Sequence, residues 1–575
     1  MLRKALIFAL AALGSAAPAL AQDAPKALLM PGVSYSREVE FTRHGPVVMH
    51  VIEAPKPGGL YSLAPVLSND LIVGRERVTE MERRVSSTAT VVGVNGDLFT
   101  PEGHPSGILM RDGILDRVPT RDRSSIGIAS DGSLRVERVD YAGYYKGSGQ
   151  RRGITVNSLA SPNGIALFTP TWGATTTGVP SYEVVLRPLA SLRPNTDLVG
   201  KVVSAGSTVG STAIPPDGAV LQARGTSAAK LAAEAPVGSE VAVRVQLTPS
   251  WEGIPDALGG GPLIVRDSKA VFRANEIFPA SLLTARTART AVGQRANGRI
   301  LLVAVDGQQP GYSVGMTNFE LALAMMRLGA VTAAALDSRG STTMAFDGQL
   351  LNRPSERGGE LPVAEALLVG YGGVYAAPPA EPVLSPNQDG IAEQQSLTYK
   401  LVRPSKVQAK LIAPDGSARD LDSGERAPGV VRFTWDGRVG GNGAASELEG
   451  RWRFAVTATD DEGQTSTADR YFFLNNTLQS LDVAPAVVRL GGGGLKGSFV
   501  VRRKAKVTIT IENASWIVLR VLARARTLAP GEHRFTWDGR NDSGKLVPGG
   551  HLGVHVVAEN GLGRVELRDT FRARR

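Results

Sequence analysis

Apolar and polar positions follow two different patterns along this chain. Residues 130–250 and most residues beyond 383 alternate between apolar and polar, with Gly and Pro turns at short intervals. Alternation places successive side chains on opposite faces of a strand, so these stretches predict half-buried β-strands. Residues 88–94 (TATVVGV) are instead almost continuously apolar, which predicts a strand buried on both faces.

A strand–helix–strand unit is predicted between residues 299 and 338. RILLVAVDG (299–307) and VTAAALDS (331–338) are apolar runs that end in polar turns, and TNFELALAMMRLGA (317–330) between them has helical periodicity. Because both strands are apolar throughout, we expect a crossover that joins two parallel strands.

Helix signals support this unit and suggest one more helix. Thr317 and Glu320 have capping-box spacing, and Gly329 supplies a C-terminal stop. A second helix is expected over 77–85 (RVTEMERRV). We therefore predict an α+β catalytic-type domain with a mixed sheet over residues 22–375.

An internal repeat predicts the organisation of the C-terminal third. FTWDGR occurs at 433–438 and again 102 residues later, each time followed by a Gly-rich turn and an alternating run. This spacing predicts two all-β Ig-like sandwiches, over 383–476 and 477–575, after a Pro/Ala linker at 376–382. Both copies resemble the Ig-like domain of the flagellar hook-cap protein.

The N-terminus has the features of a secretory signal peptide. Arg3 and Lys4 precede an apolar run at 5–13, and Ala19-Leu20-Ala21 has the small-x-small pattern of a cleavage site. We predict residues 1–21 as the signal peptide of a secreted, periplasmic or extracellular protein, with no transmembrane segment after its removal. The chain has no cysteine, so its domains must rely on buried cores rather than disulfides.

The charge balance is basic but carries little information about partners. The formal charge is +10, and losing Arg3 and Lys4 would leave about +8. Basic residues are dispersed and aromatic residues make up only 6% of the chain, which argues against a nucleic-acid partner. An anionic envelope polymer remains an expected class of partner, for which the C-terminal β domains offer docking surfaces.

Two acidic residues stand where the predicted parallel strands end. Asp306 and Asp337 would lie at the same edge of the sheet, and ligands of α/β sheets bind at that edge. They are either a shared site or two turn-forming residues. Asp306 begins an Asp-Gly turn, whereas Asp337 is followed by Ser-Arg-Gly-Ser, which a simple turn explains less well.

Further polar and glycine-rich segments carry candidate site residues. Asn95, Gly96 and Asp97 follow the buried strand at 88–94, and carboxylates such as Asp97 can stabilise a cationic carbon or activate water. Gly260 and Gly261 either let backbone amides approach a ligand or allow two strands to cross closely. The Arg286 and Arg289 guanidiniums match phosphate oxygens, and the alternative for Arg286 is an ordinary solvated arginine.

Four segments together resemble the phosphodiester glycosidase family, typified by the lysosomal uncovering enzyme that removes N-acetylglucosamine from a sugar phosphodiester. They are VNGDLFTPEGHPSGILMRDG (94–113), LGGGPLIVRD (258–267), RTARTAVGQRANGRILLVAVDG (286–307) and LDSRGSTTMAFDGQLLNRPSE (336–356). The resemblance spans about residues 40–375. It implies a site with Asp97, Asp306 and Asp337 as carboxylates, Asn95, Gly340 and Ser341 as substrate contacts, and Arg289 as an expected arginine.

This sequence departs from the family at the last motif. The usual form is L-D-G-G-G-S, but here Ser338 and Arg339 replace the first two glycines. Gln308 and Leu361 stand where the family has arginines. Arg339 is therefore either a relocated phosphate clamp or a sign of a decayed site in which it fills the sugar pocket.

The sequence thus predicts a secreted hydrolase that cleaves a glycosyl-phosphodiester bond in an envelope or extracellular glycan. Its expected partner is a phosphorylated glycan or a sugar phosphodiester. The alternative is a non-catalytic, glycan-binding or adhesion protein of the envelope. We expect no metal site and no cofactor, because the histidines are scattered without ligand spacing.

Overall fold

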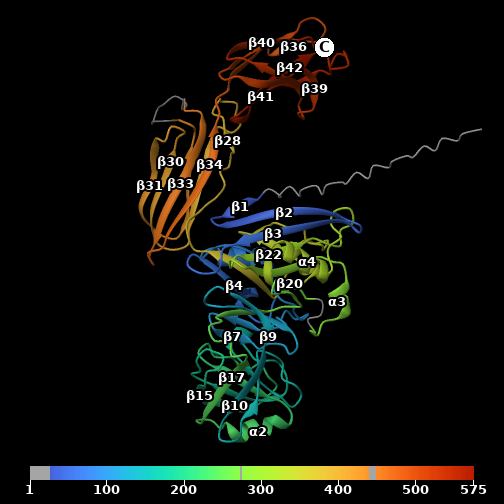
Figure 1. The fold of residues 1–575 in the computed structure, drawn as a ribbon. Coiled ribbons are helices and arrows are strands. Elements are labelled where there is room, and N and C mark those ends of the chain that lie inside the picture. Colours follow the sequence, from blue (N-terminus) through green and yellow to red (C-terminus); the bar gives the residue numbers. More distant parts are fainter. Residues whose placement is uncertain (1–25, 272–274, 439–447) are drawn as a thin grey trace, which may run out of the picture.

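The computed structural model describes residues 26–271, 275–438 and 448–575 of the chain, so the predicted signal peptide at 1–21 lies outside the described residues. The molecule is elongated (Figure 1). A central body carries a lower lobe at one end and two successive β-sandwiches at the other. Within the described ranges, no helix has both the length and the apolar character needed to cross a membrane.

Four sheets build the N-terminal region, and they are called sheets I to IV here. Sheet I has the order β1 (Ala27–Met30), β2 (Val33–Thr42), β3 (Gly45–Ala54), β22 (Ile300–Val305), β21 (Arg289–Arg295), β23 (Ala330–Ala335), β19 (Leu263–Arg266) and β20 (Lys269–Ala270). Sheet II has the order β25 (Gln349–Leu350), β24 (Met344–Phe346), β5 (Thr90–Asn95), β26 (Glu365–Tyr371) and β4 (Tyr61–Leu67).

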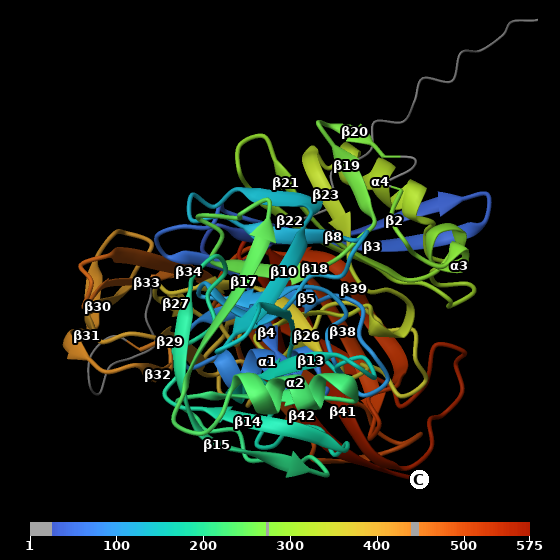
Figure 2. The same ribbon diagram turned by 90° about the horizontal axis from the view of Figure 1, so that it is seen from below.

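Sheets III and IV extend from the central body into the lower lobe. Sheet III has the order β7 (Ile114–Arg117), β6 (Leu109–Arg111), β18 (Asp256–Gly259), β8 (Ser124–Ile128) and β9 (Leu134–Arg138). Sheet IV has the order β11 (Arg152–Gly153), β10 (Asp140–Lys146), β17 (Glu240–Thr248), β15 (Leu198–Thr208), β14 (Ser181–Leu186), β16 (Ala219–Ala223), β13 (Ile165–Phe168) and β12 (Thr155–Val156). Viewed from below, α2 lies across sheet IV near β14 (Figure 2).

Helices are few and short. The described residues contain four α-helices, α1 (Val78–Val85), α2 (Thr226–Glu234), α3 (Ala280–Thr284) and α4 (Asn318–Arg327), and three 3-10 turns, Ser68–Asp70, Pro170–Trp172 and Arg339–Ser341. The two helices expected from the sequence are α1 and α4, and both are confirmed. The capping box of Thr317 and Glu320 is formed, because each side chain accepts the other residue's backbone N–H.

The predicted α+β class with a mixed sheet is wrong for this region, which is nearly all β. β22 and β23 run in the same direction, as expected, but β21 lies between them and is antiparallel to both. Every strand pair in sheet I is antiparallel.

The misleading signal was the apolar character of these strands, which reports burial on both faces rather than strand direction. In β22, Leu301, Val303 and Val305 pack in the core beneath α4, whereas Ile300, Leu302 and Ala304 pack in the core that is shared with sheet II. A helix on one face and a second sheet on the other therefore produce the same apolar run as a parallel sheet.

The two predicted C-terminal sandwiches are present. The first pairs a sheet of β27 (Tyr375–Ala376), β29 (Gln395–Leu401) and β32 (Gly429–Trp435) with one of β28 (Val383–Leu384), β34 (Thr465–Leu474), β33 (Gly450–Asp460), β30 (Ser405–Ile412) and β31 (Ala418–Arg426). The second pairs β35 (Leu478–Ala484), β37 (Leu495–Val501) and β40 (Gly531–Trp537) with β36 (Val487–Arg489), β42 (Gly563–Arg574), β41 (Gly550–Asn560), β38 (Ala505–Asn513) and β39 (Val518–Leu528).

The repeated tryptophans occupy equivalent positions in the two sandwiches. Trp435 ends β32 and Trp537 ends β40, and both indole rings are buried. Each Nε1 donates over 2.8 Å to the carbonyl three residues further on, that of Arg438 or of Arg540. The domain boundaries at 376, 383 and 477 stay predictions.

The first sandwich makes polar contacts with the central body. Lys400 of β29 donates its Nζ to Ser86 Oγ over 2.7 Å and lies 3.4 Å from Asp347 Oδ1. Arg470 of β34 donates to the carbonyl of Leu29 in β1 at 3.4 Å. Since Lys400 is only 9% exposed, its charge depends on these partners.

Lys400→Met is expected to destabilise the junction between the first sandwich and the central body. The variant keeps the length of the side chain but loses charged hydrogen bonds, each worth about 1.5–3 kcal/mol. Thermal unfolding followed by calorimetry should show a lower transition temperature. Lys410→Met is the matched control, because Lys410 lies in the same sandwich with a 3.8 Å contact to the exposed Asp420. An equal effect of both substitutions would contradict the expectation.

Candidate active site

Strand ends from two sheets meet at one side of the central body. In sheet I, β21 begins at Arg289, while β22 and β23 end shortly before Asp306 and Asp337. In sheet II, β5 ends at Asn95 and β26 begins at Glu365. The fully buried Asn95 joins the two sheets, because its Nδ2 donates to the carbonyl of Asp337 over 3.0 Å.

Asp97 is a buried carboxylate with one paired and one unpaired oxygen. Its Oδ1 accepts from the Arg123 guanidinium, whereas Oδ2 has no hydrogen-bond partner among the described residues. The backbones of Gly107 and Gly259 lie close to this unpaired oxygen. A Cβ at Gly259 would lie 2.1 Å from Oδ2, and one at Gly107 would lie 2.7 Å from it. Both positions must therefore be glycine for the carboxylate to fit.

Asp337 is a second buried carboxyl of the same cluster. It is 9% exposed, and its backbone N–H donates to the carbonyl of Gly96 over 3.0 Å. Burial raises the pKa of Asp337 to about 6, and the nearby Asp97 carboxylate raises it as well. Hydrogen bonds from Ser341 and from the Ser338 backbone oppose this rise in the pKa. A carboxyl with this pKa exchanges protons readily near neutral pH, as a general acid or base requires.

Glu365 is a third carboxyl, fully buried, that the sequence analysis missed. Its Oε1 accepts from the Asp97 backbone N–H over 3.2 Å, and its Oε2 has no partner in the described part of the chain. Burial raises the pKa of Glu365 to about 8, and the Asp97 carboxylate adds to the rise. Glu365 is therefore protonated at neutral pH, so the Asp97 carboxylate has no second negative charge beside it.

Glu365→Gln is expected to remove part of the alkaline instability of the protein. The folded pKa of about 8 lies above the ordinary 4.5, so the stabilisation from protonated Glu365 is complete below pH 4.5 and is lost as the pH rises through 8. Between pH 7 and pH 9 the wild type should lose about 1.4 kcal/mol of unfolding free energy that the variant retains. Urea unfolding at both pH values measures this difference, and identical pH slopes would contradict it.

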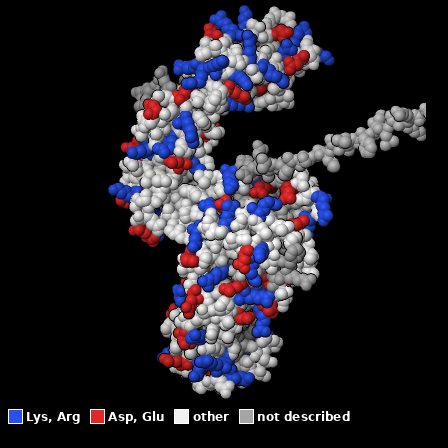
Figure 3. Space-filling model, in the orientation of Figure 1, with Lys and Arg blue, Asp and Glu red and all other residues white. Residues whose placement is uncertain are grey.

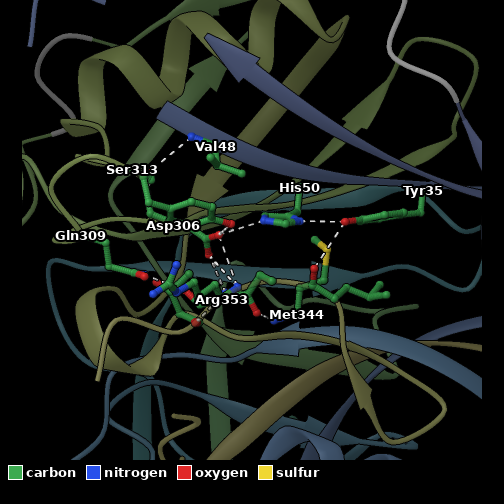
Figure 4. Close-up of polar contacts among 12 residues, drawn as sticks. Tyr35, Val48, His50, Asp306, Gln309, Ser313, Met344 and Arg353 are labelled. Atoms are coloured by element: carbon green, nitrogen blue, oxygen red, sulfur yellow. Dashed lines mark hydrogen bonds and ion pairs between the residues drawn. The ribbon is translucent and has the colours of Figure 1, made fainter. Parts of the chain in front are cut away.

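Asp306 lies at the same sheet edge but belongs to a separate network (Figure 4). Its Oδ2 accepts from His50 Nε2 over 3.0 Å and from the Tyr312 hydroxyl over 2.9 Å. Its Oδ1 accepts from Asn352 Nδ2 over 3.0 Å and from the Arg353 backbone N–H over 3.1 Å. With 0% exposure and both oxygens satisfied, Asp306 organises the loops around it. Among the described residues, no hydrogen bond or ion pair joins Asp306 to Asp337.

The predicted arginines have different surroundings. Arg289 is 1% exposed, and its guanidinium donates to the carbonyls of Leu282, Ala285 and Met316. Burial lowers the pKa of Arg289 to about 10, and the positive charge of Arg339 lowers it further.

Arg286 pairs with Glu320. Arg339 is exposed, has φ 63°, and forms no ion pair within the described residues. The side chain is thus not paired with a site carboxylate.

The predicted glycines and Ser341 lie close to the carboxyl cluster. Gly96 packs against Glu365, whose Cγ would lie 2.5 Å from an added Cβ. Gly260 and Gly261 follow β18, and Arg123 reaches the carbonyl of Gly260 at 3.4 Å. Gly340 faces Glu356 and Leu361, while Ser341 is 7% exposed and hydrogen-bonds to Asp337.

Several site residues gave no clear signal in the sequence. Arg123 lies in an ordinary polar turn, and Glu365 is a single acid at the start of an apolar strand. Arg117, at the end of β7, is mostly buried near Asp97 and Glu365, and burial lowers its pKa. The His104 ring packs 5.0 Å from that of Trp172 on the same side. These contacts join residues that are up to 268 positions apart in the sequence, so no local motif could reveal them.

The arrangement combines proton exchange with charge stabilisation. Asp97 and Asp337 supply carboxylates, Arg123 holds one of them, and Arg339 presents a free cation at the exposed edge. The described residues contain no cluster of three His, Asp or Glu side chains able to hold a metal ion. Carboxylates with an adjacent cation suit cleavage of a bond between a sugar and an acidic leaving group.

Family models match two parts of the chain. Residues 195–370 match the phosphodiester glycosidase model, and residues 486–561 match the FlgD Ig-like domain model. Both resemblances drawn from the sequence are thereby confirmed. The SPbeta prophage-derived uncharacterized protein YomE of Bacillus subtilis (strain 168) is 29% identical over 120 residues, which are 21% of this chain and 18% of that protein.

Several solved structures are similar to part of this chain. A hypothetical protein from Synechocystis has a TM-score of 0.50 and 25% identity, covering 59% of this chain and 62% of that one. A putative exported protein from Burkholderia pseudomallei K96243 has a TM-score of 0.46 and 24% identity, with coverage of 56% and 74%. The zebrafish N-acetylglucosamine-1-phosphodiester alpha-N-acetylglucosaminidase catalytic domain, auto-inhibited by its pro-peptide, has a TM-score of 0.32 and 14% identity, with coverage of 60% and 84%. This chain spans less than two thirds of the YomE and Synechocystis proteins.

Proposed function

We propose that this chain, which carries a phosphodiester glycosidase domain, hydrolyses the bond between a sugar's anomeric carbon and a phosphodiester in an extracellular or envelope glycan. The observation that carries the proposal is the pair of buried carboxyls Asp97 and Asp337, one ion-paired with Arg123 and the other with a pKa near 6. Asp337 lies inside the segment that matches the family model. The signal-peptide pattern at residues 1–21 supports secretion as part of the proposal.

The proposed reaction assigns one role to each charged group. Above pH 6 the ionised Asp337 takes a proton from water as the oxygen of that water bonds to the anomeric carbon. The bond from that carbon to the phosphate oxygen breaks, and the phosphate monoester leaves with the bonding electrons. Asp97 stabilises the positive charge that develops on the sugar ring, and Arg339 holds the departing phosphate.

Release of sugar from a panel of sugar-1-phosphodiesters by the full-length chain tests this function. N-acetylglucosamine 1-phosphate diesters should be hydrolysed to the free sugar and a phosphate monoester. Matched O-glycosides without phosphate test whether the phosphate is required. Release from the O-glycosides alone, or release from no compound, would overturn the proposal. Binding of the diesters without any release would instead favour the non-catalytic glycan-binding protein.

A further inference from the structure

A second cationic surface lies beside the candidate active site, around Tyr312. The Arg353 guanidinium carbon lies 4.8 Å from the centre of the Tyr312 ring, and that of Arg37 lies 5.9 Å from it. Both arginines are exposed, and neither forms an ion pair with any described residue. Arg123 and Arg286 at the same edge are both paired with carboxylates. We call Arg37, Tyr312 and Arg353 the arginine–tyrosine face.

Buried groups hold this face in position. The Tyr312 hydroxyl donates to Asp306 Oδ2, and the Arg353 backbone N–H donates to Asp306 Oδ1 (Figure 4). His50 and Tyr35 extend the network, since His50 Nδ1 lies 2.8 Å from the Tyr35 hydroxyl. The Tyr312 ring and the Arg353 backbone are therefore fixed from below. The Arg37 side chain also hydrogen-bonds to Tyr312, and both guanidiniums are exposed to a ligand. Such preorganisation reduces the entropy lost on binding.

The face suits a phosphate group. Two guanidiniums beside one ring repel each other, and an anion placed between them relieves that repulsion. The planar donors of arginine match phosphate oxygens in pairs, which an ammonium group does not. On the surface drawn in Figure 3, acidic and basic side chains are interspersed.

The face and the proposed active site share one edge of sheet I. Asp306 follows β22 and Asp337 follows β23, with only β21 between these strands. Because β21 lies between β22 and β23, two inter-strand distances separate them, and their ends lie about 10 Å apart. Asn352 links both places, because its Nδ2 donates to Asp306 Oδ1 and to the carbonyl of Thr342. A single phosphate cannot span this distance, but a chain with recurring phosphates can.

We propose that the arginine–tyrosine face is a second phosphate subsite, which binds a neighbouring phosphodiester of a polymeric sugar-phosphate substrate while one linkage is cleaved at Asp337. This inference rests on the proposed function for its cleavage step. Anion binding at the face does not depend on that step, so the two can be tested separately.

Kinetics on two substrates test the subsite in the full-length protein. The substrates are a synthetic tetramer of N-acetylglucosamine joined through 1-phosphodiesters and a monomeric methyl phosphodiester of the same sugar. Wild type should favour the tetramer in kcat/KM. The double variant Arg37→Gln/Arg353→Gln should lose about tenfold or more on the tetramer, as expected for two charged hydrogen-bonding groups, with little change on the monomer. Equal losses on both substrates, or no preference in wild type, would overturn the inference.

Titration calorimetry with inorganic tripolyphosphate tests the face without any turnover. The double variant should bind the probe at least about tenfold more weakly than wild type, and Arg37→Lys/Arg353→Lys should recover part of the affinity. Arg266→Gln is the matched control, because Arg266 is an exposed arginine on β19 beyond the other edge. Unchanged binding in the double variant, or equal weakening by the control, would overturn the inference. If no phosphodiester is hydrolysed but the double variant still loses tripolyphosphate, the proposed function fails and the anion subsite stands.

Discussion

Asp337→Asn is expected to lower kcat/KM on a sugar-1-phosphodiester by about a thousandfold, within the range for loss of a general acid or base. The amide keeps the size of the carboxyl but cannot take a proton from water. In wild type, kcat/KM should rise with pH and level off above about 6, since Asp337 works in its ionised form. Steady-state kinetics across pH 4–8 measure both effects.

Asp337→Asn should also stabilise the protein. A loss of activity in a more stable variant is then a catalytic defect and not a folding defect. The folded pKa of Asp337 is about 6 against an ordinary 3.8, so its contribution to stability is complete below pH 3.8 and is lost as the pH rises through 6. Near pH 7 the buried charge costs about 3 kcal/mol, and asparagine removes most of that cost. Asp267→Asn, an exposed acid beyond β19, is the control for both measurements. Wild-type activity in Asp337→Asn would exclude the proposed mechanism.

Arg123→Leu is expected to destabilise the fold by about 3–5 kcal/mol, because it leaves the Asp97 carboxylate buried without its counter-ion. The side chains of Arg123 and Asp97 are 8% and 1% exposed, so water cannot replace the lost partner. Urea unfolding at pH 7 measures the change. The effect should exceed that of any other single arginine at this edge.

Two further variants test the origin of that loss. Asp97→Asn together with Arg123→Leu removes the unpaired charge and should recover about half or more of the lost stability, since a neutral buried pair costs less than one orphan charge. Arg286→Leu is the matched control, because the Arg286–Glu320 pair is more exposed, at 20% and 36%. A surface pair of this kind contributes about 0–1 kcal/mol. A double variant no more stable than Arg123→Leu would contradict the ion-pair argument.

Local patterns in the sequence were sufficient wherever neighbouring residues decide the structure. The capping box at Thr317, the apolar runs that became β5, β22 and β23, and the FTWDGR repeats each depend on contacts within a short segment or a single domain. The direction of strand pairing could not be predicted in the same way. β21 enters between β22 and β23 from an earlier part of the chain, and no periodicity encodes that insertion.

The sequence by itself determined several of the strand segments, the two C-terminal sandwiches, and the motifs that resemble the phosphodiester glycosidase family. Only the tertiary structure decided which charged groups work together. Asp97 and Asp337 are separated by 240 residues in sequence, yet the Asp97 carboxylate helps to raise the pKa of Asp337, while Asp306 joins His50 and Tyr312 instead. The physical reason is that a carboxyl's pKa and partners depend on burial and on distant chain segments, whereas residue order controls only nearby contacts.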